Sequence, residues 1–195
     1  MIRALFGGSF DPVHNGHLAI VDHLLARGLA GHVTVVPAGL SPFKDGSSAA
    51  ADQRLAMVRL AFADRAGVTV DDREIRREGR SYTIDTLRAL VAEHPGDSWR
   101  LVIGADHLPR LAGWRAAADL VGLSEVVVMP RAGLRPQLPD DAEPSRFILV
   151  EDFDEPVSSS AIRAMLAAGS VPVSGLPAPV ARHIREHGLY GLQRP

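Results

Sequence analysis

Short apolar runs rich in β-branched residues alternate with helical patterns along nearly the whole chain, and this alternation restricts the fold more than any other feature. The runs have the length of buried strands, and two of them end at a proline, Pro37 and Pro130. Strands are expected at residues 2–6, 33–36, 68–70, 101–103, 125–129 and 147–150. Repeated strand–helix alternation is typical of a parallel sheet with helices on both faces. The sequence therefore predicts an α/β fold built on a doubly wound parallel sheet.

Helical patterns fill most of the intervals between these strands. Helices are expected at residues 14–25, 52–62, 84–91, 158–166 and 179–187, the second of them capped by Asp52. The last two expected helices, at residues 158–166 and 179–187, indicate a small C-terminal helical subdomain over the C-terminal edge of the sheet. A length of 195 residues fits one domain with a real core. We therefore expect residues 1–195 to form a single domain, with 158–195 as its helical C-terminal part.

Three segments are expected to connect these elements without regular structure. Residues 38–50 are rich in glycine, serine and alanine, and residues 131–144 contain several prolines and glycines with two adjacent acids. Both are therefore expected to be irregular loops. Residues 73–80 mix both charge signs and are expected to form a solvated connection.

Composition argues against several classes of protein. The net charge of −2 is unlike that of a general nucleic-acid or membrane-surface binder, which usually has a basic excess. The chain has no cysteine, so disulfides and thiolate chemistry are not expected. We find neither a signal peptide nor an apolar run of the roughly 18 residues that a spanning helix needs. A cytoplasmic enzyme is the expectation, and the sequence leaves open whether it forms a homo-oligomer.

The stretch from Gly7 to Leu18 carries the strongest functional signal in the chain. It joins the first expected strand to the first expected helix and reads Gly-Gly-Ser-Phe-Asp-Pro-Val-His-Asn-Gly-His-Leu. The Gly7-Gly8 pair lets the backbone leave the strand in conformations that a Cβ would forbid, and it lets a ligand approach closely. Pro12 has no N–H for a helix interior, so the helix is expected to begin after it, near His14.

Two histidines in this stretch predict an anion site. His14 and His17 are three residues apart, so both imidazoles are expected on one face of the first helical turn. Unpaired N–H groups and the positive end of the helix dipole gather at the same terminus. Together these groups suit a phosphate. A zinc site is disfavoured, because the chain has no cysteine and no carboxylate at the usual ligand spacing from this pair, and no metal ligand is predicted.

The same twelve residues resemble the signature of the nucleotidylyltransferase superfamily, in which a strand is followed by a His-x-Gly-His turn. This version is similar to that of the bacterial nicotinate-nucleotide adenylyltransferase family. The resemblance implies a Rossmann-like nucleotidylyltransferase fold in which His14 and His17 bind the phosphates of ATP. It also implies that the turn lies against the nucleotide, through Gly7, Gly8, Ser9 and Phe10.

A second motif, Val157-Ser158-Ser159-Ser160-Ala161-Ile162-Arg163, opens a later helix. Its hydroxyls supply a cap and spare donors, and Arg163 lies one turn on, where it can reach the same anion. A simple serine cap followed by a surface arginine is the alternative. The segment resembles the family's Ile-Ser-Ser-Thr-x-Ile-Arg motif, which closes on the triphosphate. The resemblance therefore implies that Ser158, Ser159 and Arg163 bind ATP.

Two basic residues in the expected loops are further candidates. Lys44 lies where its side chain can either swing onto a phosphate or remain solvated. The family reads Pro-Pro-His-Lys here, and Ser41-Pro42-Phe43-Lys44 lacks the first proline and the histidine. The resemblance still implies a catalytic role for Lys44, together with the two histidines and Arg163. Arg131 resembles the arginine of an Arg-Pro-Gly turn in the family.

Three more segments resemble family motifs. In Ser81-Tyr82-Thr83-Ile84-Asp85-Thr86-Leu87 the family places the first threonine, here Thr83, beside the pyridine nucleotide. Gly104 and Asp106 end an expected strand, where open α/β sheets place ligand contacts. The resemblance assigns both to the ATP site, with the aspartate at the adenosine sugar. It also implies that Trp114 stacks on the nicotinate ring. The structural alternatives are a helix start, a helix cap and a core tryptophan.

The resemblance implies transfer of the adenylyl group of ATP to nicotinate mononucleotide, which releases pyrophosphate and forms nicotinate adenine dinucleotide, a precursor of NAD. The attacking phosphate oxygen is already ionised near neutral pH, so no general base is required. Catalysis is then expected to depend on alignment and on stabilisation of charge. Mg²⁺ is expected as an ion bound to ATP. The alternatives are a phosphopantetheine adenylyltransferase, which shares the opening turn, and a nucleotide-binding sensor without turnover.

Overall fold

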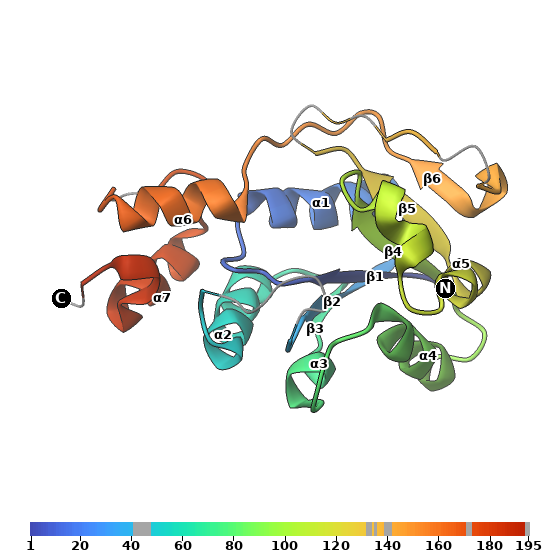
Figure 1. Ribbon diagram of the computed structural model, residues 1–195, viewed down its shortest axis with the longest axis horizontal. Helices are drawn as coiled ribbons and strands as arrows, with labels where there is room; N and C mark the ends of the chain where they lie inside the picture. Colours follow the sequence, from blue (N-terminus) through green and yellow to red (C-terminus); the bar gives the residue numbers. More distant parts are fainter. Residues whose placement is uncertain (41–47, 132–133, 135, 139–141, 171–172, 194–195) are drawn as a thin grey trace.

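Six parallel strands form one sheet within the described part of the chain (Figure 1). The computed structural model describes all residues except 41–47, 132–133, 135, 139–141, 171–172 and 194–195. The strands are β1 (Ile2–Gly8), β2 (His32–Pro37), β3 (Val68–Val70), β4 (Ser98–Gly104), β5 (Glu125–Met129) and β6 (Phe147–Leu149). Each expected strand is present, and β4 begins earlier than its apolar run because Ser98, Trp99 and Arg100 also pair with β1.

The order of the strands across the sheet is β3-β2-β1-β4-β5-β6. The chain therefore runs from β1 toward one edge and then returns to the other side of β1. Leu5 of β1 is paired with Thr34 of β2 on one side and with Leu101 of β4 on the other, both in parallel. In open α/β sheets, ligands bind outside the carboxyl ends of the strands at such a reversal. The predicted doubly wound parallel sheet is confirmed, and the reversal lies between β1 and β4.

Helices cover both faces of the sheet, and alternate side chains of β1 belong to two different cores. Ala4 and Phe6 join a cluster of buried residues from α1 (Asn15–Ala26), α2 (Ala51–Phe62), α6 (Ser159–Ala167) and α7 (Ala178–His187). Leu5, between them, joins a second cluster with α4 (Thr83–Glu93), α5 (Ala117–Leu123) and the 3-10 helix η1 (Leu108–Gly113). The end of β1 is therefore flanked by different helices on its two faces.

The C-terminal helices lie on the α1 and α2 side of the molecule, where α6 and α7 are drawn in orange and red in Figure 1. Their buried residues belong to the same core cluster as α1 and α2; these are Ile162, Leu166, Val180 and Ile184. Two 3-10 turns complete the described chain, η2 (Pro144–Arg146) before β6 and η3 (Leu189–Gly191) after α7. The grouping of residues 158–195 as the helical part of a single domain stays a prediction. Among the described residues, no helix is both long enough and apolar enough to cross a membrane.

The prediction that Asp52 caps the second helix is wrong. The helix begins at Ala51, its cap position is Ala50, and no side chain caps it. Asp52 lies within the first turn, where its negative charge complements the positive end of the helix dipole. The sequence pattern therefore located the helix correctly but assigned the acidic residue to the wrong position.

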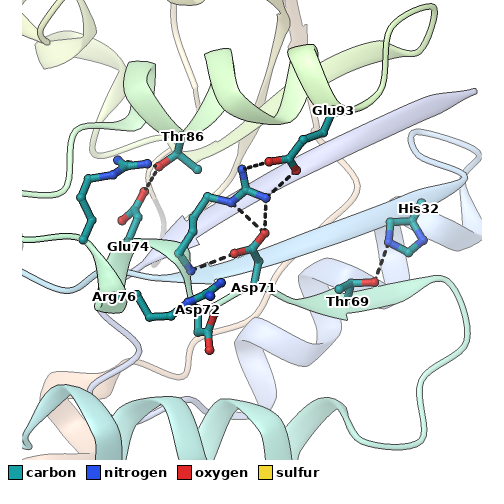
Figure 2. A network of polar contacts seen from close by, with 10 residues as sticks. His32, Thr69, Asp71, Asp72, Glu74, Arg76, Thr86 and Glu93 are labelled. Carbon is teal, nitrogen blue, oxygen red and sulfur yellow. Dashed lines mark hydrogen bonds and ion pairs between the residues drawn. The ribbon is translucent and has the colours of Figure 1, made fainter.

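The prediction of a solvated connection at residues 73–80 is wrong in part. Arg73–Arg76 forms a helical turn, α3, and its Glu74 is buried. The polar network in Figure 2 shows the reason. Arg73 donates hydrogen bonds to Asp71 and to both carboxylate oxygens of Glu93, and the Thr86 hydroxyl donates to Glu74 at 2.6 Å. The mixed charges pair with one another and hold α3 against α4.

Candidate active site

A pocket of about 260 Å³ opens at the carboxyl ends of β1 and β4, where the strand order reverses. The ends of both strands line the pocket, together with the starts of α1, α4 and α6 and the segment after η1. Because α1 and α6 cover one face of the sheet and α4 and η1 the other, two sets of side chains reach the pocket from opposite faces. We call the first set, His14, His17, Ser159 and Arg163, the histidine wall. We call the second set, Glu74, Ser81, Thr83 and Trp114, the tryptophan wall.

The start of α1 brings the two histidines together. His14 occupies the N-cap position, and its ring lies 3.7 Å from the ring of His17 between centroids, with 30° between the planes. The backbone N–H of His14 donates to Nδ1 of His17 at 3.1 Å, which leaves the proton of a neutral His17 on Nε2. The expected proximity of the two imidazoles is confirmed. Not every amide of this terminus is free, since the N–H of Asn15 donates to the carbonyl of Gly175 at 2.8 Å.

Burial keeps both imidazoles neutral. His14 is 5% exposed, and desolvation, aided by the positive charge of Arg131, lowers its pKa to about 4. Desolvation, with smaller effects of His14 and Arg131, lowers the pKa of His17 well below its ordinary value. Nδ1 of His14 is buried and has no hydrogen-bond partner among the described residues. In the unliganded protein these two residues therefore offer ring nitrogens, not fixed positive charge, to an anion.

The turn after β1 allows a ligand to approach and also orients His17. A Cβ on Gly7 would meet nothing within 4 Å, so the backbone there borders open space. Phe10 has a φ of 47°, a left-handed conformation that is costly for an aromatic residue. Its buried ring contacts Phe6 and His17 edge-on, at centroid distances of 5.5 and 4.9 Å. The ring of His17 therefore rests on a residue held in an unusual conformation.

Helix α6 reaches the pocket through hydrogen bonds to the same turn. Ser158 caps α6 with its hydroxyl, as predicted. The Ser159 hydroxyl donates to the carbonyl of Pro12 at 3.0 Å, and Nη1 of Arg163 donates to the carbonyl of Asp11 at 2.7 Å. These bonds use only some of the donors of Arg163, which has five N–H groups. A side chain 152 residues away in the sequence is thereby fixed beside the histidines.

The tryptophan wall comes from the opposite face of the sheet. Thr83 is the first residue of α4, and Trp114 follows η1. Glu74 adds a buried carboxylate to this wall, and Figure 2 shows it beside Thr86. Burial raises the pKa of Glu74, while hydrogen bonds from the hydroxyls of Thr86 and Ser81 oppose the rise. This wall therefore combines an aromatic ring and a threonine with a carboxylate whose oxygens already have protein partners.

Gly104 and Asp106 form a close pair at the end of β4. A Cβ on Gly104 would lie 2.5 Å from Oδ1 of Asp106, so the carboxylate takes this position only beside a glycine. Oδ2 of Asp106 accepts a hydrogen bond from Arg131 at 3.2 Å. Oδ1 is buried and has no hydrogen-bond partner among the described residues. The end of β4 therefore holds a buried carboxylate oxygen without a partner among the described residues, while its contact with a sugar hydroxyl stays a prediction.

Most of the predicted site residues line this one pocket. They are Gly7, Gly8, Ser9, Phe10, His14, His17, Thr83, Gly104, Trp114, Ser159 and Arg163. Asp106 and Ser158 are neighbours of lining residues but do not line the pocket themselves. Lys44 lies outside the described residues. The structure thus brings together segments that are far apart in the sequence, while the roles of the individual side chains stay predictions.

Sequence reasoning gave no role to four polar residues near the pocket, Asp11, Arg54, Glu74 and Tyr190. The carboxylate of Asp11 accepts hydrogen bonds from the N–H groups of Ser48 and Ala49 and from the Tyr190 hydroxyl. A signal for Arg54 was available, because it shares the buried side of α2 with apolar residues at helical spacing, Met57, Val58 and Phe62. A charged residue within an apolar stripe needs a buried partner. Tyr190 and Glu74 carry no comparable signal.

Comparison with known proteins places this geometry in context. Residues 5–165 match the family model described as cytidylyltransferase-like. A relative from Chlorobaculum tepidum, named "Probable nicotinate-nucleotide adenylyltransferase", is 38% identical over 97% of this chain and 99% of its own length. A relative of the same name from Aeromonas salmonicida is 38% identical over 95% of each chain. Plasmodium falciparum nicotinic acid mononucleotide adenylyltransferase complexed with NaAD matches with a TM-score of 0.78, covering 98% of both chains at 17% identity. At that identity the structural likeness supports the fold alone.

Proposed function

This chain belongs to the cytidylyltransferase-like family and, within it, to the nicotinate-nucleotide adenylyltransferases, and we propose from that premise how its pocket works. The protein transfers the adenylyl group of ATP to nicotinate mononucleotide, giving nicotinate adenine dinucleotide and pyrophosphate in NAD biosynthesis. The observation that carries this function is the near-full-length similarity to relatives of that name. We further propose a cytoplasmic location, with ATP and nicotinate mononucleotide as the partners of the protein.

Catalysis would depend on alignment rather than on proton abstraction. The attacking oxygen belongs to the phosphate of nicotinate mononucleotide, which is already ionised near neutral pH. It attacks the α-phosphorus of ATP, the new oxygen–phosphorus bond forms, and pyrophosphate leaves with the electron pair of the broken bond. Holding two phosphates in line removes much of the entropic cost of the encounter. No side chain then needs to remove a proton.

The histidine wall would stabilise the charge that develops on the phosphates. Nε2 of His17 can donate a hydrogen bond without carrying charge, because its Nδ1 is occupied by the N–H of His14. His14 can bind a proton as an anion arrives, since a neighbouring phosphate favours the charged imidazolium. The remaining N–H groups of Arg163 add donors in a planar fork. We assign these three residues to catalysis, with Lys44 as a fourth, and Ser158 and Ser159 to the start of the helix that presents Arg163.

The nucleotides would divide between the two walls. Gly7, Gly8, Ser9 and Phe10 border the space next to β1. Gly104 would belong to the ATP site, where Asp106 would meet the adenosine sugar. Thr83 and Trp114 would bind the nicotinate ring. We propose that Mg²⁺ arrives with ATP, bound by its phosphates. The donors of the histidine wall, imidazole and guanidinium N–H groups, suit phosphate oxygens and not a cation.

The direct test is release of pyrophosphate by the purified protein with ATP, Mg²⁺ and one acceptor at a time. Nicotinate mononucleotide is expected to give the highest kcat/KM, nicotinamide mononucleotide a lower one, and phosphopantetheine none. Turnover of phosphopantetheine at the highest kcat/KM would assign the chain to another adenylyl transfer. Nucleotide binding without pyrophosphate release in any mixture would make the protein a sensor and contradict the proposal.

A further inference from the structure

Arg54 is the largest fully buried side chain of the described residues, and it lies outside the pocket. It is 1% exposed on the sheet side of α2. Its guanidinium donates three hydrogen bonds, from Nη1 to the carbonyl of Ser9 at 2.7 Å, from Nη2 to Gly39 at 3.0 Å and from Nε to Ala49 at 3.3 Å. All three acceptors are backbone carbonyls. A buried charge is costly, so a position that keeps one calls for an explanation.

Two of the three carbonyls, those of Ser9 and Gly39, come from segments that border the pocket. Ser9 belongs to the turn after β1 and lines the pocket. Gly39 follows the end of β2, and Ala49 precedes α2. Burial lowers the pKa of Arg54 below its ordinary value, which is far above neutral pH, and the neighbouring carboxylate of Asp11 opposes that lowering. The guanidinium therefore stays charged and joins three chain segments at one point.

Ser9 is connected to the histidine wall by the residue that follows it. Phe10 has the left-handed φ of 47°, and its buried ring lies edge-on to His17 at 4.9 Å. The carbonyl of Ser9 belongs to the peptide group that precedes this φ. A hydrogen bond that holds this carbonyl therefore restricts the rotation that would release the strain at Phe10. Loss of that bond would let the Phe10 ring move, and with it the imidazole that rests on it.

We propose that Arg54 is a positioning residue for adenylyl transfer, which holds the Ser9 carbonyl so that the Phe10 ring keeps the imidazole of His17 aligned with the reacting phosphates. The inference rests on the proposed function, because it needs His17 to act in the transfer. Arg54 does not touch the pocket, so its effect passes through the turn. Its substitution should therefore alter kcat far more than the KM for ATP.

The first test compares two arginine-to-lysine variants. Arg54→Lys keeps the charge but cannot make three directed bonds from one planar group. We expect kcat to fall about 10- to 100-fold, the size of effect that a misplacement of about 1 Å produces, while the KM for ATP changes less than about threefold. Arg100→Lys is the matched control. Arg100 is also largely buried and donates to a backbone carbonyl, that of Leu29 at 2.7 Å, but it lies near the opposite end of β4 from the pocket.

The control separates positioning from a loss of stability. Arg100→Lys should lower the Tm while leaving kcat unchanged. The proposal would be overturned if Arg100→Lys, at an equal loss of Tm, lowered kcat as much as Arg54→Lys does. An unchanged kcat in a folded Arg54→Lys variant would also overturn it.

A double-mutant cycle tests the route through His17. If Arg54 acts by aligning that ring, Arg54→Lys should change kcat by less than about threefold in a His17→Ala background, because nothing remains to align. The same fold-change in both backgrounds would show that Arg54 acts elsewhere and would contradict the inference. The wild-type protein is the reference for the cycle. If the wild type releases no pyrophosphate, the proposed function is wrong. If the wild type is active but the effects of the two substitutions are additive, only the role of Arg54 is wrong.

A variant of Phe10 keeps the inference testable if Arg54→Lys does not fold. Phe10→Leu retains an apolar side chain but removes the aromatic edge that meets His17. We expect at least a tenfold fall in kcat with the KM for ATP nearly unchanged. A folded Phe10→Leu variant with wild-type kcat would break the connection between the turn and His17, and the proposal would fail.

Discussion

The two walls of the pocket differ in what holds their side chains. In the histidine wall the fixing partners are backbone groups. The N–H of His14 holds His17, and the carbonyls of Pro12 and Asp11 hold Ser159 and Arg163. In the tryptophan wall Glu74 and Trp114 contact other side chains, while the Ser81 hydroxyl accepts a hydrogen bond from the N–H of Gly39 at 3.0 Å. The Thr86 hydroxyl donates to Glu74, and the rings of His107 and Trp114 are 5.9 Å apart.

This difference separates the two tasks of the site. Groups held by the backbone keep their places when neighbouring side chains change, which suits a reaction that needs fixed geometry. Groups held by other side chains are altered by single substitutions, which suits the choice between similar acceptors. We therefore expect substitutions in the histidine wall to lower kcat, and substitutions in the tryptophan wall to change which acceptor is preferred.

His17→Ala should lower kcat about 10²- to 10³-fold, the usual cost of removing one preorganised donor to developing charge. The loss of Tm should be small by comparison, because the ring is held by one backbone hydrogen bond and by contacts with Phe10 and His14. Pyrophosphate release and thermal unfolding measure the two effects. His23→Ala, on the same helix but not in the lining of the pocket, should keep its kcat. Near-normal kcat in folded His17→Ala would remove the histidine wall from the chemistry.

The stability of the protein should fall as the pH is lowered from 7 to 4, in part because of His14. The folded pKa of about 4 lies below the ordinary value of 6.5, so in this range the unfolded chain binds a proton that the folded chain does not. The contribution is fully present above pH 6.5 and is lost as the pH falls toward 4. A shift of this size corresponds to about 3 kcal/mol in the free energy of unfolding. In His14→Gln the decline measured by denaturant unfolding should be smaller by that amount, and an identical decline would contradict the neutral, buried imidazole.

The order of strands and helices could be predicted because it depends on local patterns. Each strand is a short apolar run, and the start of α1 after Pro12 is set by a residue that lacks an N–H. The turn at α3 could not be predicted in this way. Arg73 binds the nearby Asp71, but it also binds Glu93 on α4, and only the fold places Glu93 near Arg73. From the sequence alone, a segment of mixed charge is predicted to be solvated, because its distant partners are not known.

The same distinction between local patterns and distant partners applies to the candidate site. His14 and His17 could be placed together because they lie within one helical turn, and the resemblance of the distant Val157–Arg163 motif to its family counterpart supplied Ser159 and Arg163. The neutral state of the two imidazoles could not be predicted, because it follows from burial by segments distant in sequence. Nor could the interactions of Arg54 and Asp11, which bind the backbone of other segments. Every residue has backbone polar groups, so the sequence does not indicate which of them a buried side chain will bind.

Arg163→Lys should lower kcat/KM for ATP about tenfold, less than the loss at His17. Lysine keeps the charge but lacks the planar fork, so it cannot bind the carbonyl of Asp11 and a phosphate with the same geometry. A lost hydrogen bond to a charged group accounts for about 1.5–3 kcal/mol, and about 1.4 kcal/mol is a factor of ten. Arg182→Lys, an exposed arginine on α7, is the control and should behave as wild type. Equal kcat/KM values for the two variants would mean that Arg163 only holds the turn after β1 and does not bind ATP.

The smallest expected effect is the clearest test of the tryptophan wall. Nicotinate carries a carboxylate where nicotinamide carries a neutral amide, and hydrogen bonds to charged acceptors contribute about 1 kcal/mol more than neutral ones. We expect wild-type kcat/KM to favour nicotinate mononucleotide at least about tenfold, with Thr83 and the start of α4 supplying donors. Thr83→Val removes one donor and should lower that preference about fivefold while kcat with the better acceptor falls less than about threefold. Thr69→Val, which removes a hydroxyl on β3 that forms a hydrogen bond with His32, serves as the control. An unchanged preference in Thr83→Val, or a large loss of kcat with both acceptors, would mean that the two walls do not divide selection from chemistry.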